Sequence, residues 1–197
     1  MSPARFSLFY RGRAPLVLAS ASPRRVQLLR QAGATFSVLD PGPDRPWPGQ
    51  AEPRHGTRAL ALDKARRVAT RREGSVVIGA DTVVVLRGVR LGKPRDAAEA
   101  LVMLGRLQGR THEVWTGVAV VRDREQRTAA EVTRVQFARL TEAEMAAYVR
   151  TGEPLGKAGG YAIQGQAAQF VRRIEGDYAN VVGLPLHRLR AVLADFA

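Results

Sequence analysis

The fold class follows from residues 76–86, which read Val76-Val77-Ile78-Gly79-Ala80-Asp81-Thr82-Val83-Val84-Val85-Leu86. Two runs rich in valine flank a polar pair, Asp81-Thr82. Apolar, β-branched runs of this length are typical of buried strands. We therefore predict a strand region over 76–86 that is interrupted at Asp81-Thr82. Arg87-Gly88 then predicts a turn that brings the chain back toward Leu91.

Strand and helix patterns alternate on both sides of this stretch. Ser22-Pro23 is typical of an N-cap followed by proline at the first helical position, and Thr141 with Glu144 forms a capping box. The expected strands are 16–19, 36–39, 112–121, 130–137 and 170–174, and the expected helices are 22–33, 54–72, 97–107, 141–150 and 185–196. This order predicts a mixed α/β sheet with some antiparallel pairing.

Composition limits the function classes. The chain of 197 residues has a net charge of +13, which usually suggests a nucleic acid or an anionic membrane. However, 28 of the 31 basic residues are arginine, aromatic residues are 6%, and the arginines are dispersed. A GC-rich genome explains this bias, so we expect neither a nucleic-acid partner nor a membrane partner. A nucleic-acid-binding protein is kept as an alternative, which a salt-sensitive gel shift would favour.

Other classes are excluded by single features. The chain has no cysteine, which excludes disulfides, thiolate zinc sites and cysteine nucleophiles. No apolar run reaches 18 residues, so a transmembrane helix is not expected. We interpret residues 1–14, with Arg5, Arg11 and Arg13, as a basic N-terminal extension, and residues 15–197 as one catalytic domain. The expected location is the cytoplasm.

Two lysines and one aspartate are candidates for chemistry. Asp81 lies between two buried runs, so its carboxylate needs a cation, a metal or hydrogen bonds; the alternative is a structural aspartate that caps a turn. Lys64 falls on the helix face of Leu60 and Val68, so it should snorkel or point into a polar cleft. Lys93 is fixed between a glycine and a proline. In a chain so rich in arginine, a retained lysine favours a role for a compact ammonium.

A second candidate site is the start of the helix after residue 22. Arg24 and Arg25 in its first turn oppose the helix dipole unless an anion binds there. Ser20 and Ser22 fit a phosphate site, and two ordinary surface arginines are the alternative. The phosphate-binding loop and dinucleotide motifs are absent, and the scattered histidines lack metal-ligand spacing. We interpret His112 as structural rather than catalytic.

Eight segments of the chain form an ordered set of motifs, which are Leu18–Arg25, Ala61–Ala65, Ile78–Val84, Leu91–Pro94, Gly109–Val114, Gly152–Gly159, Tyr161–Gly165 and Ile174–Leu186. Taken in order, they resemble the Maf family of nucleoside triphosphate pyrophosphatases over about residues 15–196. The resemblance implies a mixed α/β fold with a curved central sheet, flanking helices and a cleft between two lobes, similar to inosine triphosphatase. It also implies that the protein can form a homodimer.

The resemblance implies metal-dependent hydrolysis of a nucleoside triphosphate between the α and β phosphates, with Mg²⁺ or Mn²⁺ as the cofactor. It assigns Asp81 as the general base or a metal-associated acid, with Lys64 and Lys93 as further catalytic cations. Ser20, Arg24 and Arg25 would join them around the triphosphate. Arg24, Thr82 and Gln164 match the positions that shape base selectivity in the branch that prefers dTTP and UTP.

The acidic position after the second strand departs from the family pattern. The family usually has a glutamate there, whereas this chain has Asp44, one methylene shorter and in a loop, residues 40–53, with five prolines. The resemblance implies that Asp44 is a metal ligand beside Asp81. Gly160, where alanine is common, is a minor change. Two alternatives are kept: a pyrophosphatase of the same fold with another base preference, and a non-catalytic protein that restrains cell division.

Overall fold

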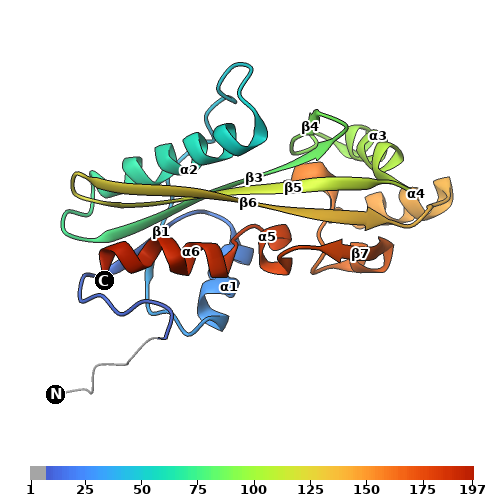
Figure 1. Cartoon of the computed structure of the whole chain (residues 1–197). Coiled ribbons are helices and arrows are strands. Elements are labelled where there is room, and N and C mark those ends of the chain that lie inside the picture. Colours follow the sequence, from blue (N-terminus) through green and yellow to red (C-terminus); the bar gives the residue numbers. More distant parts are fainter. Residues whose placement is uncertain (1–7) are drawn as a thin grey trace. The chain divides into compact units, whose positions relative to one another are not determined.

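The computed structural model describes residues 8–197, which form a mixed α/β structure around a seven-stranded sheet (Figure 1). The strands are β1 (Leu16–Ala19), β2 (Ser37–Leu39), β3 (Val76–Leu86), β4 (Val89–Leu91), β5 (Thr111–Arg122), β6 (Glu125–Phe137) and β7 (Val171–Glu175). The helices are α1 (Pro23–Gln31), α2 (Pro53–Ala69), α3 (Ala97–Leu107), α4 (Glu142–Arg150), α5 (Tyr178–Val182) and α6 (Leu186–Leu193). Short 3-10 turns cover Ala158–Gly160, Gln166–Phe170 and Ala194–Phe196.

The sheet order is β2-β1-β3-β5-β6-β7, with β4 paired to β3. The pairs β1–β2 and β1–β3 are parallel, and the pairs β3–β4 and β6–β7 are antiparallel. This arrangement confirms the mixed α/β sheet with flanking helices. The chain divides into two compact units. The first holds residues up to Asp81, Thr116–Glu131 and Gly183–Ala197, and the second holds Thr82–Trp115 and Val132–Val182. The expected cleft stays a prediction.

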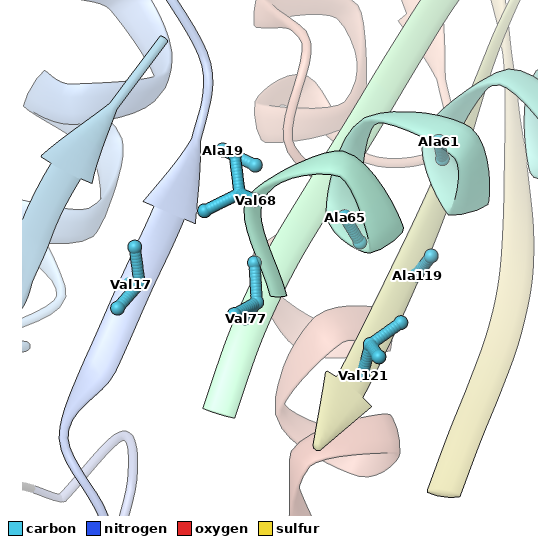
Figure 2. Packing of buried hydrophobic residues seen from close by; sticks show 8 residues of the cluster. All are labelled: Val17, Ala19, Ala61, Ala65, Val68, Val77, Ala119 and Val121. Carbon is cyan, nitrogen blue, oxygen red and sulfur yellow. The ribbon is translucent and has the colours of Figure 1, made fainter. Parts of the chain in front are cut away.

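In the first unit, helix α2 packs on one face of the sheet, and α1 and α6 lie on the opposite face (Figure 1). Figure 2 shows the small side chains at the α2 contact, which are Val17, Ala19, Ala61, Ala65, Val68, Val77, Ala119 and Val121. A Cβ on Gly79 would lie 2.1 Å from the Ala61 carbonyl oxygen, and one on Gly117 would lie 2.3 Å from the Thr57 backbone. These two glycines therefore allow the α2 backbone to lie directly on β3 and β5.

The second unit has an aromatic core. Phe137 makes edge contacts with His112 and Tyr161, whose centroids lie 5.0 Å and 4.8 Å away. The His112 Nε2 and the Tyr161 hydroxyl lie 2.8 Å apart. Burial lowers the pKa of His112 to about 4 and raises that of Tyr161 above its usual value. His112 is therefore neutral at pH 7, which agrees with a structural role.

Several local expectations need correction. Asp81-Thr82 does not interrupt the strand, because β3 runs unbroken from Val76 to Leu86. Strand β6 begins at Glu125 rather than at residue 130, and helix α5 was not expected. The last helix ends at Leu193 and is followed by a 3-10 turn. By contrast, the strand at 16–19 and the capping box at Thr141 are confirmed.

The division at residues 14 and 15 stays a prediction, and residues 1–7 lie outside the described part. Within residues 8–14, Phe9 and Tyr10 are buried, and the Tyr10 hydroxyl donates a hydrogen bond to the Phe196 carbonyl at 3.3 Å. These residues pack against the end of the chain within the first unit. No helix among residues 8–197 is long and apolar enough to cross a bilayer.

Candidate active site

The strand register places three chain segments at one edge of the first unit. Ala19 of β1 pairs with both Leu39 of β2 and Gly79 of β3, and all three strands are parallel. The chain leaves the sheet after Ala19 and after Leu39, into the segments that carry Ser20 and Asp44. Strand β3 continues past Gly79 and carries Asp81 close to the same level. The carboxyl ends of parallel strands are where ligands bind in open α/β sheets.

Lys64 is the centre of this edge. It lies on the buried face of α2, and its Nζ donates to the Asp81 Oδ1 at 2.6 Å. The same Nζ lies 2.7 Å from the Asp44 Oδ1. The Lys64 side chain is only 8% exposed. A buried ammonium needs such partners, and its single positive charge reduces the repulsion between the two carboxylates. Leu60, which was expected on the inward face, is only partly buried, because the buried face runs through Thr57, Ala61, Lys64 and Val68.

Asp81 was expected to need a cation, a metal or hydrogen bonds, and the structure supplies the first through Lys64. Its side chain is 14% exposed, so one part meets Lys64 while another part remains accessible to water. Because side chains alternate along a strand, Asp81 projects to the same face as Gly79, over which α2 lies. The close approach of α2 at Gly79 is therefore what brings Lys64 onto Asp81.

Asp44 reaches Lys64 because Arg67 of α2 and Arg71, just after this helix, hold the preceding loop. The Arg67 Nη1 donates to the carbonyls of Pro41 at 2.6 Å and Pro43 at 3.0 Å. The Arg67 Nη2 lies 2.7 Å from the Asp63 Oδ2. Arg71 donates to the Asp40 carbonyl at 2.8 Å. The proline-rich loop is thereby fixed at its start, and Asp44 stands 48% exposed at the rim.

Ser20 and Arg25 form the other side of the edge. The buried Ser20 Oγ accepts from the Ser22 N–H at 3.1 Å and from the Arg25 Nη1 at 3.4 Å. The Arg25 Nε donates to the Gly183 carbonyl at 2.7 Å. Burial lowers the pKa of Arg25, the negative charges of Asp81 and Asp44 oppose this shift, and the charge of Arg24 adds to it. Arg25 therefore belongs to the same electrostatic cluster as the two carboxylates.

The formal charges of the cluster favour an anionic ligand. Lys64, Arg24 and Arg25 carry three positive charges against the two of Asp81 and Asp44. The first turn of α1 holds no acidic residue, and its Ser22 N-cap makes no side-chain cap hydrogen bond. A helix N-terminus with two arginines and without an acidic residue is suited to phosphate oxygens.

The donor set also fits a divalent cation with a phosphate ligand. Asp44 and Asp81 each place an oxygen within 2.7 Å of one Lys64 nitrogen, so the two carboxylates lie close together. Among residues 8–197, no group of three or more histidine, aspartate or glutamate side chains could hold a metal by itself. Mg²⁺ is commonly bound by one or two carboxylates together with substrate phosphates and waters. The two carboxylates therefore fit an ion that is shared with substrate phosphates, rather than an ion bound by protein ligands alone.

The remaining candidates belong to the second unit. Lys93 is exposed between β4 and α3, and Gln164 is exposed in the segment before Gln166. Thr82 is partly buried on β3, where it projects to the face opposite Asp81. The roles of these three residues stay predictions.

Sequence reasoning missed two residues that organise these segments. Arg67 fixes the loop of Asp44, and no signal marks it among 28 arginines. Glu153 accepts hydrogen bonds from Tyr148, Gln166 and Ala167 around Gln164. Its place between Gly152 and Pro154, inside a motif, is a signal that could have found it. Lys157, to which no role was given, contributes positive charge to the surroundings of Glu153.

The chain belongs to the Maf-like protein family, because the family model of that description matches residues 15–196. It is 53% identical over 181 residues to a dTTP/UTP pyrophosphatase of Symbiobacterium thermophilum, a match that covers 92% of this chain and 93% of the relative. A dTTP/UTP pyrophosphatase of Pelotomaculum thermopropionicum is 52% identical, with 92% and 96% covered. One of Geobacter sulfurreducens is 53% identical, with 87% and 91% covered.

The fold is also found in a distant solved structure. The Staphylococcus aureus Ham1 protein superposes with a TM-score of 0.52 at 14% identity, covering 93% of this chain and all of that protein. At this identity the likeness concerns the fold alone. It agrees with the mixed α/β architecture expected from the sequence.

Proposed function

We propose that this protein hydrolyses dTTP and UTP to the nucleoside monophosphate and pyrophosphate. The observation that carries the proposal is the joining of Asp81, Lys64 and Asp44 at one sheet edge in a chain about half identical to relatives named dTTP/UTP pyrophosphatase. A carboxylate that is fixed by a cation and remains partly accessible to water is the arrangement that a water-activating base needs.

The triphosphate would bind through the cations of the edge. Arg24, Arg25 and the first turn of α1 would hold phosphate oxygens, and Lys93 would offset charge on the leaving pyrophosphate. Asp81 would orient a water molecule and accept its proton as the water oxygen attacks the α-phosphorus. The bond from that phosphorus to the bridging oxygen breaks, and its electron pair leaves with pyrophosphate. Lys64 would fix the orientation of the Asp81 carboxylate through their hydrogen bond.

The proposed cofactor is Mg²⁺ or Mn²⁺, held by Asp81 and Asp44. When bound, such an ion supplies Lewis-acid stabilisation of the phosphate charge. Titration of Mn²⁺ followed by calorimetry tests this assignment without reference to activity. Asp44→Asn should weaken Mn²⁺ binding about tenfold or more, because it removes one of two anionic ligands. Equal affinities of the two proteins for Mn²⁺ would remove Asp44 from the metal site.

Base selectivity is assigned to Arg24, Thr82 and Gln164. The exposed Gln164 carries an amide that can donate to and accept from a pyrimidine edge. Gln164→Ala should lower kcat/KM for dTTP and UTP more than for other triphosphates. An equal loss with all eight common nucleotides would contradict base reading at this position.

The test of the whole proposal is pyrophosphate release from a panel of canonical and modified triphosphates with Mg²⁺ or Mn²⁺. We expect dTTP and UTP to be the preferred canonical substrates. Preference for a purine triphosphate would favour the alternative pyrophosphatase, and absence of release with every substrate would favour the non-catalytic alternative.

The cytoplasmic location and the homodimer are also proposed here. Their support is the family resemblance and a substrate class that belongs to nucleotide metabolism. Light scattering coupled to gel filtration tests the dimer, and a gel shift at physiological salt tests the expectation that nucleic acid is not a partner.

A further inference from the structure

The carboxylate of Glu153 accepts hydrogen bonds from the backbone of the segment that carries Gln164. Its Oε2 accepts from the Gln166 N–H at 3.0 Å, and its Oε1 accepts from the Ala167 N–H at 3.4 Å. The two donors lie two and three residues after Gln164 in the chain. Glu153 therefore fixes the chain on the C-terminal side of the exposed Gln164. Because the donors are backbone N–H groups, a substitution of the Gln164 side chain would not remove these hydrogen bonds.

A second connection fixes the N-terminal side. The Tyr148 hydroxyl donates to the Glu153 Oε1 at 2.8 Å and accepts from the Ala162 N–H at 3.2 Å. Tyr148 is 3% exposed, and its ring packs edge-on against Phe170 at 5.2 Å. The hydroxyl position is therefore set by a packed aromatic ring. Glu153 and Tyr148 together hold the backbone on both sides of Gln164.

The space for this carboxylate depends on a glycine. A Cβ on Gly165 would lie 2.4–2.5 Å from the carboxylate atoms of Glu153, so only glycine at 165 admits the side chain in this position. Partial burial pushes the pKa of Glu153 up, but the hydrogen bonds from Gln166, Tyr148 and Ala167 and the charge of Lys157 hold it below its usual value. The acceptor is ionised at neutral pH, and hydrogen bonds to an ionised acceptor are the stronger kind.

The geometry points to Glu153, acting with Tyr148, as the positioning residue that sets the base selectivity of Gln164. This inference rests on the proposed function of Gln164. Glu153 itself need not touch the nucleotide. A side-chain amide that reads a base must be held at a fixed place, since a small displacement breaks its hydrogen bonds.

The experiment compares selectivity rather than activity alone. The variants are Glu153→Gln, which keeps the shape but removes the charge and one acceptor, and Tyr148→Phe, which removes only the hydroxyl. Glu142→Gln is the matched control, because it removes an exposed carboxylate from the same unit. The readout is the ratio of kcat/KM for dTTP to that for dCTP, measured with and without Gln164→Ala. Melting temperatures are recorded for each protein.

We expect Glu153→Gln to lower the ratio about tenfold, Tyr148→Phe to lower it in the same direction, and Glu142→Gln to leave it unchanged. In the Gln164→Ala background, Glu153→Gln should change the ratio no further. A lower melting temperature with an unchanged ratio would overturn the inference in favour of a structural role. An equal further loss in the Gln164→Ala background would also overturn it.

Failure of the underlying proposal has a different signature. If Gln164→Ala alone leaves the ratio unchanged, Gln164 does not read the base, and the assignment of selectivity to Glu153 is overturned with it. Hydrogen exchange separately tests whether Glu153 and Tyr148 hold the backbone on both sides of Gln164, an arrangement called the clamp here. The amides of Ala162, Gln166 and Ala167 should exchange faster in Glu153→Gln than in Glu142→Gln, and equal exchange would contradict the clamp.

Discussion

Replacing Lys64 with methionine tests the central ion cluster. Methionine keeps the apolar stem but leaves Asp81 and Asp44 without their shared ammonium. Loss of one partner from a buried pair costs about 3–5 kcal/mol. Lys64 and Asp81 are 8% and 14% exposed, while Asp44 is 48% exposed and returns to water readily. Because Asp81 also keeps some contact with water, we expect a loss of about 2–3 kcal/mol in the free energy of unfolding.

The assay is urea unfolding followed by circular dichroism at neutral pH. Lys64→Met should lower the midpoint without a large change in slope. Arg66→Met is the control, because Arg66 is an exposed cation of the same helix that pairs with Gln126; its effect should be within about 0.5 kcal/mol. Adding Asp81→Asn to Lys64→Met should recover part of the loss, since the neutral amide needs no cation. Equal stability of Lys64→Met and the unmodified protein would refute the reasoning.

Three further predictions concern the supports of the site. Gly79→Ala should lower the free energy of unfolding by about 1–3 kcal/mol and reduce turnover, since its Cβ would displace α2. Gly105→Ala, in open space within α3, is the control. Equal melting temperatures of Gly79→Ala and the unmodified protein would contradict the close approach of α2. Arg67→Met should weaken Mn²⁺ binding about tenfold, because it releases the loop of Asp44; unchanged calorimetric affinity would dismiss that support. The pKa of Glu153 is below its usual 4.5, so its stabilising effect is present above that pH and is lost as pH falls further. The stability difference between Glu153→Gln and the unmodified protein should therefore shrink as the pH falls below 4.5, and a difference independent of pH would contradict this sign.

Much of the framework could be predicted from local signals. Proline after Ser22 marked the start of α1, and the capping box marked α4. The helical spacing placed Lys64 on a buried face, and the apolar runs around Asp81 implied that its carboxylate needs a cation, a metal or hydrogen bonds. These succeeded because burial of apolar residues and the needs of a desolvated charge act through the sequence itself.

The rest depends on contacts between distant segments. The contact between Lys64 and Asp81 joins residues 17 positions apart, and the close packing of α2 at Gly79 produces it. A glycine inside a strand pattern is a signal for such an approach. The role of Arg67 depends on where the proline-rich loop folds back, which no local pattern states. The polar pair at 81 and 82 did not break β3, because tertiary pairing supplied the cation that the carboxylate needs.

The most direct test of the account compares Asp81→Asn with the unmodified protein, using dTTP turnover and the affinity for a dTTP analogue with a methylene bridge between the α and β phosphates. The change retains size and removes the proton-accepting charge. We predict that turnover falls by about 10²–10⁴-fold, while the analogue binds within about threefold of the original affinity, because Arg24, Arg25 and Lys64 remain. Turnover of dTTP by Asp81→Asn at the rate of the unmodified protein would contradict the account.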